Sequence, residues 1–147
     1  AERERIVPIA VPPTADALAF GEALGRVLAE RPDVAVLASS DLTHYGPRYH
    51  FTPHGRGAEA LAWVKDHNDA EIVDAMIALL PGRVLAHANA HQSACGAGAI
   101  AAVLTAARAL GATRGERLAY TTSADVRPDL CADDFVGYAS IGVPCPS

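Results

Sequence analysis

The chain has 147 residues, of which 50% are hydrophobic, so it is long and apolar enough for one domain with a core. Its formal net charge of −5 and the lack of a Lys/Arg cluster argue against a nucleic-acid partner, whose phosphates require a basic surface. No apolar run approaches the length of a membrane span, and no signal-type core follows the charged amino terminus, so we expect a soluble, cytoplasmic protein without a membrane partner. An odd number of widely spaced cysteines also favours a reducing compartment; they are Cys95, Cys131 and Cys145.

The chain begins with alternating strand and helix patterns. Residues 6–11 predict a short strand. A helix is expected to begin at Thr14, its cap, and to end before Pro32, because apolar residues recur between them at helical spacing. Residues 34–38 are all apolar and predict a buried strand.

Residues 39–46 place polar, proton-handling side chains directly after that apolar run. Because ligands bind at the carboxyl ends of strands in open α/β sheets, an acid and a histidine three positions apart at such an end form a candidate site. The Asp41 carboxylate would fix the tautomer of the His44 imidazole, which would then move a proton near neutral pH. The structural alternative is that Asp41 caps a turn and His44 is an ordinary surface residue.

The rest of the chain predicts helices and a final pair of strands. Residues 84–94 have no clean period and predict a loop. The other elements expected are an irregular loop at 45–57, helices at 58–64, 69–80 and 96–110, and strands at 117–123 and 135–143. The order predicts an α/β protein with a sheet flanked by helices and with the last two strands as antiparallel neighbours.

A second polar group, from His91 to Gly96, precedes the strongest helix pattern. With Ser93 as N-cap, Cys95 would fall in the first turn, where free amides and the helix dipole stabilise a thiolate. Cys95 would then be a nucleophile or a metal ligand, and it is equally compatible with a small buried cysteine at a tight helix contact. His91 would either approach the same pocket or satisfy a backbone carbonyl.

Four further side chains are candidates for lining a substrate pocket: Ser40, Tyr45, Ser123 and Asp125. The Tyr45 hydroxyl would donate a hydrogen bond to a bound oxygen. Ser123 and Asp125 end a predicted strand, where they would line the same sheet edge or cap a turn. Ser40 is a weak candidate for a hydrolytic nucleophile, because no Gly-x-Ser-x-Gly elbow surrounds it.

Four motifs, taken in order, resemble the Memo family, whose bacterial members are often called AmmeMemoRadiSam system protein B. They are Ala-Ser-Ser-Asp-Leu-Thr-His-Tyr at 38–45, Ala-Cys-Gly at 94–96, Tyr-Thr-Thr-Ser-Ala-Asp-Val at 120–126 and Val-Gly-Tyr-Ala at 136–139. The resemblance extends from about Ile6 to Val143. It implies a fold like that of class III extradiol dioxygenases, a mixed sheet flanked by helices with the site at one sheet edge.

The same resemblance assigns expected roles. His44 matches the acid/base histidine of the ring-cleaving relatives, Asp41 is its pocket neighbour, and Cys95 matches the metal-binding cysteine of the family. His91 matches a histidine that some members carry before this cysteine, which makes it a weaker ligand candidate. The two histidines that join the cysteine around the metal in the family come from a first half that this sequence lacks, so residues 1–147 are expected to form one Memo-like domain corresponding to the C-terminal half of the usual length.

Three functional hypotheses follow. The first is a metal-dependent redox or dioxygenase-like protein that uses iron or copper, with an incomplete site that a second copy or a partner chain completes; this chain alone would then hold no metal. The alternative is a non-catalytic interaction module that retains the fold and binds partners through the loop at 45–57. The third is thiol-based hydrolase or transferase chemistry at Cys95, and none of the three identifies a small-molecule substrate.

Overall fold

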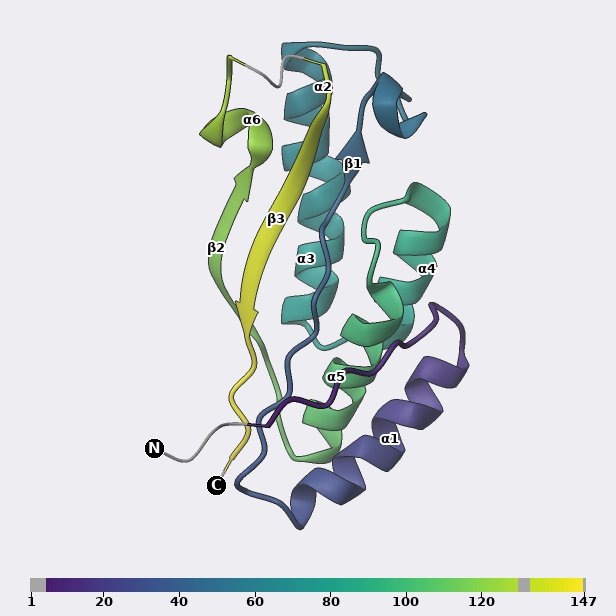
Figure 1. Cartoon of the computed structure of the whole chain (residues 1–147), viewed down its shortest axis with the longest axis vertical. Coiled ribbons are helices and arrows are strands. Elements are labelled where there is room, and N and C mark those ends of the chain that lie inside the picture. The colour runs from purple at the N-terminus through teal and green to yellow at the C-terminus, as the bar shows by residue number, and fades with distance from the viewer. Residues whose placement is uncertain (1–4, 130–132, 147) are drawn as a thin grey trace.

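The computed structural model describes residues 5–129 and 133–146 of the chain, and Figure 1 shows its helices and strands. The longer helices are α1 (Asp16–Ala29), α3 (Asp69–Ile77), α4 (Pro81–His91) and α5 (Ala97–Ala109). The shorter ones are the 3-10 turn η1 (Pro47–Tyr49), α2 (Ala58–Trp63), the π-helical turn η2 (Val64–Asn68) and α6 (Ser123–Val126). The strands are β1 (His44–Tyr45), β2 (Glu116–Thr122) and β3 (Phe135–Gly142).

The described strands form one small antiparallel sheet in the order β1-β3-β2. His44 pairs with Val136 at one edge of β3, and Thr122 pairs with Gly137 at the other. Helix α3 lies behind these strands, α4 and α5 lie to its right in the view of Figure 1, and α1 packs against α5. The predicted α/β class is therefore confirmed, and so is the antiparallel pairing of the last two strands.

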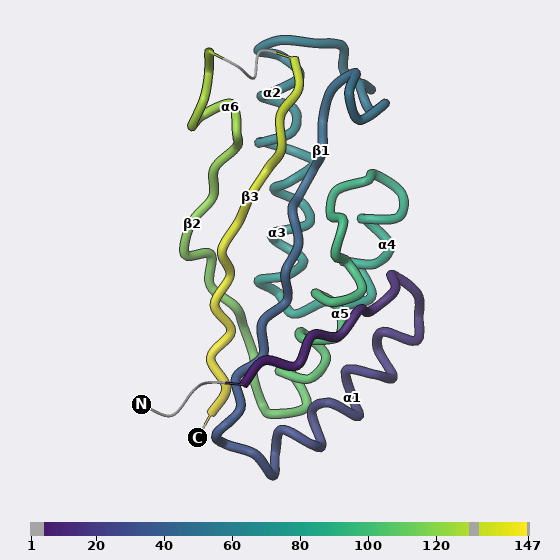
Figure 2. The backbone as a smooth tube through the Cα atoms, viewed as in Figure 1, coloured from purple at the N-terminus to yellow at the C-terminus, as the bar shows by residue number. Residues whose placement is uncertain are grey.

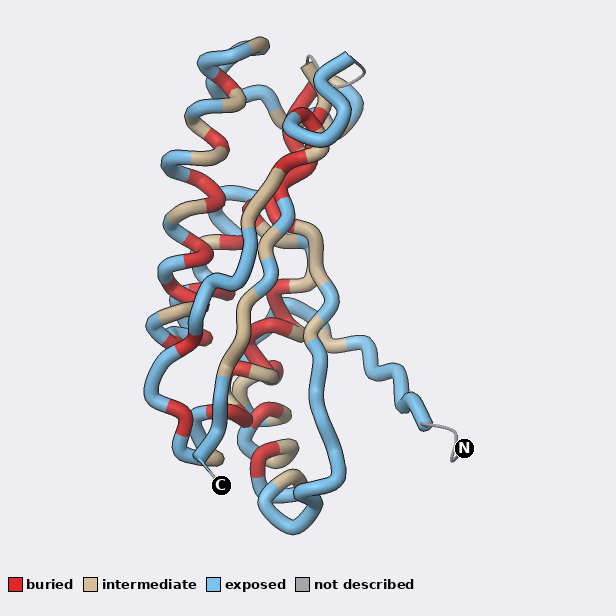
Figure 3. The backbone as a smooth tube through the Cα atoms, turned by 90° about the vertical axis from the view of Figure 1, so that its left-hand side faces the viewer, coloured by how far each residue is buried: buried red, intermediate tan, exposed pale blue. Residues whose placement is uncertain are grey.

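Two predicted strands, at 6–11 and 34–38, are wrong. Both segments are extended but join no strand ladder of the described chain, and both are largely exposed, as Ile6 (88%) and Leu37 (89%) illustrate. Figure 3 shows the first segment leading away from the body, and Figure 2 shows the second as the connection from α1 to β1. The physical reason is that an apolar run becomes a strand only where a partner edge is available, and β3 accepts this connection only from Leu42 onward, where the Leu42 amide donates to the Gly137 carbonyl.

The predicted loop at 84–94 is also wrong, because most of it belongs to helix α4. Pro81 occupies the first helical turn, where its missing N–H costs nothing. Val84, Leu85 and Ala88 are buried on one face, and alanine, asparagine and histidine between them dilute the apolar stripe. The helices predicted at 58–64, 69–80 and 96–110 are confirmed, although α3 ends at Ile77.

Helix α1 contacts α5 through its smallest residues rather than its largest. Ala17, Gly21 and Gly25 are the buried positions of α1 and recur every four residues, whereas Val27 is 60% exposed. A Cβ at Gly21 would lie 2.5 Å from the Ala102 carbonyl oxygen, so the two helix backbones approach as closely as glycine allows.

The buried side chains form two clusters. The larger lies among α3, α4, α5 and the sheet, and the smaller surrounds Tyr45 and Phe135, whose rings stack with centroids 5.1 Å apart. Cys95 and Cys145 are free thiols, and Cys131 lies outside the described residues. Among the described helices, none is both long enough and apolar enough to cross a membrane.

Candidate functional site

The Asp41–His44 pair lies at the start of β1, not at the end of a preceding strand. The His44 Nε2 atom is 3.2 Å from the Asp41 Oδ2 atom, and both side chains are partly exposed. The Tyr49 ring lies beside the imidazole, with ring centroids 5.0 Å apart. The predicted contact between the acid and the histidine is therefore present, although the strand expected to deliver it is absent.

Cys95 lies in the loop between α4 and α5, opposite Asp41. The Cys95 amide donates to the Asp41 carbonyl oxygen (3.2 Å), and the Asp41 amide approaches the Cys95 Sγ atom (3.3 Å). The N-cap of α5 is Gly96, without a side-chain cap, so the predicted Ser93 cap and the placement of Cys95 in the first helical turn are wrong. The helix begins later because Ser93 is buried and its hydroxyl bonds to His87 instead.

Ser40 joins the two loops. Its hydroxyl accepts a hydrogen bond from the Gly96 amide (2.8 Å) and donates to the Asp41 carbonyl oxygen (2.7 Å). A Cβ at Gly96 would lie 2.6 Å from the Ser39 carbonyl oxygen, so this close approach requires glycine. Because the Ser40 proton is engaged in this backbone bond, the hydroxyl acts here as a link between loops.

Asp41, His44 and Cys95 form a group of potential metal donors. One ligand atom from each of these side chains lies within 4.8 Å of the others. The set combines a soft thiol sulfur, an imidazole nitrogen and a carboxylate oxygen, a mixture that suits iron, copper or zinc better than magnesium or calcium. A pocket of about 400 Å³ adjoins the group and is also lined by Tyr49 and Gln92.

The other predicted site residues do not line this pocket. Tyr45 is fully buried in the smaller core cluster, where its hydroxyl donates to the Gly55 carbonyl oxygen. The Ser123 hydroxyl accepts from the Val136 amide, and Asp125 forms a capping box with Thr122 at α6. These three side chains hold the backbone around the sheet.

His91 is exposed near the end of α4 and is not part of the three-residue donor group. Its ring lies beside that of His87, with centroids 4.7 Å apart, and its backbone carbonyl accepts from the Asn68 amide side chain (3.1 Å). Among the described contacts, the His91 ring thus makes neither of the two that were predicted, and its own carbonyl anchors the end of α4.

The sequence reasoning missed Asn68 and Asp69, which hold the turn between Asp41 and His44 through hydrogen bonds to Thr43. Asp69 is fully buried, and its Oδ1 atom accepts from both the amide (3.1 Å) and the hydroxyl of Thr43. Asn68 donates to the same hydroxyl (2.9 Å), while the other Asp69 oxygen accepts from the Tyr120 hydroxyl (2.8 Å). The signal available was a polar pair between Val64 and Ile72 on an otherwise apolar helix face. The π-helical turn η2, a feature frequent at functional sites, ends at Asn68.

Burial governs the protonation of this supporting group. It raises the pKa of the Asp69 carboxyl above its usual range, although hydrogen bonds from Thr43 and Tyr120 act in the opposite sense. Burial first, and then the adjacent Asp69 charge, raise the pKa of Tyr120, so its hydroxyl stays a donor at neutral pH. A Cβ at Gly137 would lie 1.9 Å from the Asp69 Oδ2 atom, so β3 passes this carboxyl only because it carries a glycine there.

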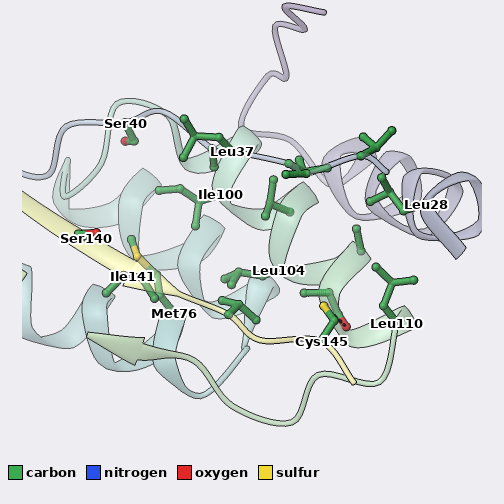
Figure 4. A pocket seen from close by; sticks show the side chains of 18 of the residues that line it. Leu28, Leu37, Ser40, Met76, Ile100, Leu104, Leu110, Ser140, Ile141 and Cys145 are labelled. Atoms are coloured by element: carbon green, nitrogen blue, oxygen red, sulfur yellow. Dashed lines mark hydrogen bonds between the residues drawn. The ribbon is translucent and has the colours of Figure 1, made fainter. Parts of the chain in front are cut away.

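A larger pocket, of about 760 Å³, has Ser40 in its lining, so this predicted pocket residue lines the larger pocket and not the smaller one. It is enclosed by the 34–38 segment, α5 and the end of β3, and its lining is mostly aliphatic, as Leu37, Ile100 and Leu104 in Figure 4 illustrate. Asp41, His44 and Cys95 do not line it. Its size reflects apolar surface left uncovered beside β3, whereas His44 and Cys95 line the smaller pocket.

Comparison with known proteins finds one family. The model of the Memo-like protein family matches residues 1–142. A MEMO1 family protein of Methanosarcina barkeri is 40% identical over 109 residues, which cover 74% of this chain and 35% of that protein. Similar proteins of Pyrococcus abyssi (36% identical; 82% and 43% covered) and Methanopyrus kandleri (33% identical; 95% and 45% covered) carry the same family name. The chain therefore spans between a third and a half of the length of these relatives.

Proposed function

The chain belongs to the Memo family, and we propose that it provides the Asp/His/Cys side of a metal-dependent redox centre with dioxygenase-like activity. The observation that carries this proposal is the meeting of Asp41, His44 and Cys95 ligand atoms within 4.8 Å beside a pocket. Because the chain covers 35% of the Methanosarcina relative, the activity of the whole protein is part of the proposal, as is its correspondence to the C-terminal half.

The proposed metal ligand of this chain is the Cys95 thiolate. Cys95 is exposed, its sulfur accepts a hydrogen bond from the Asp41 amide, and a metal would bind it in the deprotonated form. Iron or copper would supply the one-electron chemistry that protein side chains lack. A reducing, cytoplasmic compartment would keep this sulfur available as a thiol.

Asp41 and His44 are proposed as the acid/base pair. A carboxylate only accepts hydrogen bonds, so its contact with Nε2 requires the proton on that nitrogen and leaves Nδ1 of neutral His44 able to accept one. The adjacent Tyr49 ring restricts the imidazole plane, so His44 would receive a substrate proton from a defined direction. This arrangement supports the proposed general-base role of His44.

Metal analysis of the purified chain after addition of ferrous or cupric ions tests the proposal. Cys95→Ala is expected to abolish stoichiometric binding, whereas Cys145→Ala, which changes another exposed free thiol, is expected to leave it intact. His44→Gln is expected to retain the metal, because His44 moves protons in this scheme. Binding that survives Cys95→Ala would contradict the proposal, and loss of metal in His44→Gln would contradict the division of roles.

We further propose that the chain self-associates. In this scheme the chain supplies one metal ligand, Cys95, whereas protein metal sites use three or four, so additional ligands would come from another chain. The exposed apolar side chain of Leu37, beside the larger pocket with its mostly aliphatic lining, belongs to a surface of the kind that proteins cover by association.

A further inference from the structure

A second polar cluster lies beneath the loop that carries Cys95. Ser93 is fully buried, and its Oγ atom is 2.7 Å from the Nδ1 atom of His87 on α4. The side chain of His87 is 9% exposed, and its Nε2 atom is 3.3 Å from the Glu71 Oε2 atom on α3. The line from Glu71 through His87 to Ser93 therefore links two helices to the base of the loop.

The chemistry of the three groups fixes the direction of both bonds. Because the Glu71 carboxylate only accepts, the Nε2 atom of His87 carries the proton, and the Nδ1 atom then accepts from the Ser93 hydroxyl. Burial, followed by the nearby charge of His91, lowers the pKa of His87, which favours this neutral ring at neutral pH.

This order of side chains resembles a hydrolytic triad, but its geometry excludes that function. Ser93 has no exposed surface, so a substrate carbonyl does not reach its hydroxyl. Ser93 is instead placed to hold backbone, two residues before Cys95. The preceding Gln92 adopts a left-handed conformation (φ 50°), unfavourable for a residue with a side chain, so the sharp reversal after α4 needs such an anchor.

We propose that His87 is a positioning residue for Cys95, acting through Ser93. The loop is bonded at its other end to Asp41 and Ser40, through the amides of Cys95 and Gly96. His87 holds Ser93, and Asp41 and Ser40 hold the amides of Cys95 and Gly96. These contacts keep the Cys95 Sγ atom close to Asp41 and His44. The consequence for metal binding rests on the proposed function, whereas the consequence for the two amides does not.

Two substitutions of His87 separate its two contacts. The amide of asparagine reaches the position of Nδ1, so His87→Asn keeps a partner for Ser93. The amide of glutamine reaches the position of Nε2, so His87→Gln keeps a partner for Glu71.

Two measurements report the effect of these variants. The metal probe is cobalt(II), whose absorption band from thiolate ligation reports a bond to Cys95. Hydrogen exchange of the Cys95 and Gly96 amides, measured by NMR on the full chain, reports the loop without any metal.

We expect His87→Gln to weaken thiolate-bound cobalt about tenfold or more, the scale seen for partners that orient ligands, and to accelerate exchange of both amides. His87→Asn is expected to stay close to the unchanged protein in both measurements. His67→Gln, a change of an exposed histidine in the π-helical turn, is the matched control and should have no effect. Ser93→Ala keeps the His87 side chain and should accelerate exchange of the Cys95 and Gly96 amides, as His87→Gln does. If His87→Gln does not fold, Ser93→Ala tests the proposal in its place.

Equal amide exchange in the unchanged protein, His87→Gln and Ser93→Ala would overturn the proposal. Equal impairment of His87→Asn and His87→Gln would also overturn it, because the contact with Ser93 would then not be the cause. If the unchanged protein gives no thiolate–cobalt band, the proposed metal function fails, and the exchange rates still decide whether His87 positions the loop.

Discussion

At the scale of single residues, the buried carboxyl of Asp69 connects the site to the sheet. It accepts hydrogen bonds from Thr43 on one side and from Tyr120 on the other. Since Thr43 lies between Asp41 and His44 in the turn, the position of the acid/base pair depends on a helix residue that touches neither member. The group also faces Gly137 at a distance that excludes any side chain there.

Asp69→Asn is expected to change how stability depends on pH. Burial raises the folded-state pKa of this carboxyl above the usual 3.8, so the folded chain binds a proton more tightly than the unfolded chain does. Its stabilising contribution is therefore complete below the unfolded-state pKa and is lost as pH rises through the folded-state pKa. The free energy of unfolding of the unchanged protein, minus that of Asp69→Asn, should fall with rising pH in urea titrations. Asp74→Asn, on the exposed side of the same helix, is the control, and a difference that does not vary with pH would contradict the expectation.

The sequence motifs predicted Asp41, His44 and Cys95 but not the buried residues that hold them in place. Asp41 and His44 are three positions apart, so their contact follows from local geometry, and the resemblance to a family supplied Cys95 as their neighbour. The contact between Thr43 and Asp69 joins residues 26 positions apart, and no local pattern reports it. The role of His87 has no local signal either, because nothing nearby in the sequence identifies Glu71 and Ser93 as its partners.

At the scale of elements, helices were predicted well because their 3.6-residue period is local. Helix α5 shows a strong apolar stripe, whereas α4 was missed because its stripe is short. The two absent strands, at 6–11 and 34–38, show the opposite problem, since a strand depends on a partner edge that its own residues do not encode. Apolar composition alone therefore overestimated the sheet.

Gly21→Ala is expected to weaken the contact between α1 and α5. The added Cβ would meet the Ala102 carbonyl oxygen at 2.5 Å and Thr105 Cβ at 2.7 Å, so the helices must separate. We expect a loss of about 1–3 kcal/mol in the free energy of unfolding, measured with urea. Gly82→Ala in α4 meets no atom within 4 Å and should instead be neutral or stabilising by up to about 1 kcal/mol. An equal free energy of unfolding for Gly21→Ala and the unchanged protein would contradict the expectation, because α1 and α5 would then separate without loss of stability.

At the scale of the whole molecule, the reactive group and the uncovered apolar surface lie on neighbouring parts of the same connection. Residues 34–38 line the larger pocket, and Asp41 and His44 follow directly along the chain. A partner that covers the first segment would thus approach the donors of the second. Association and completion of the metal site are expected to be linked for this reason.

Leu37→Glu is expected to disrupt self-association. Leu37 is 89% exposed and lines the larger pocket, so burying a carboxylate there would oppose any interface that covers this face. Sedimentation velocity should give a mass above 15.2 kDa for the unchanged chain and a shift toward 15.2 kDa for Leu37→Glu. Val126→Glu is the matched control, because Val126 is 65% exposed on α6 and does not line the pocket, so its association should be unchanged. A monomer at all concentrations for the unchanged chain would contradict self-association and would require the missing ligands to come from a different chain.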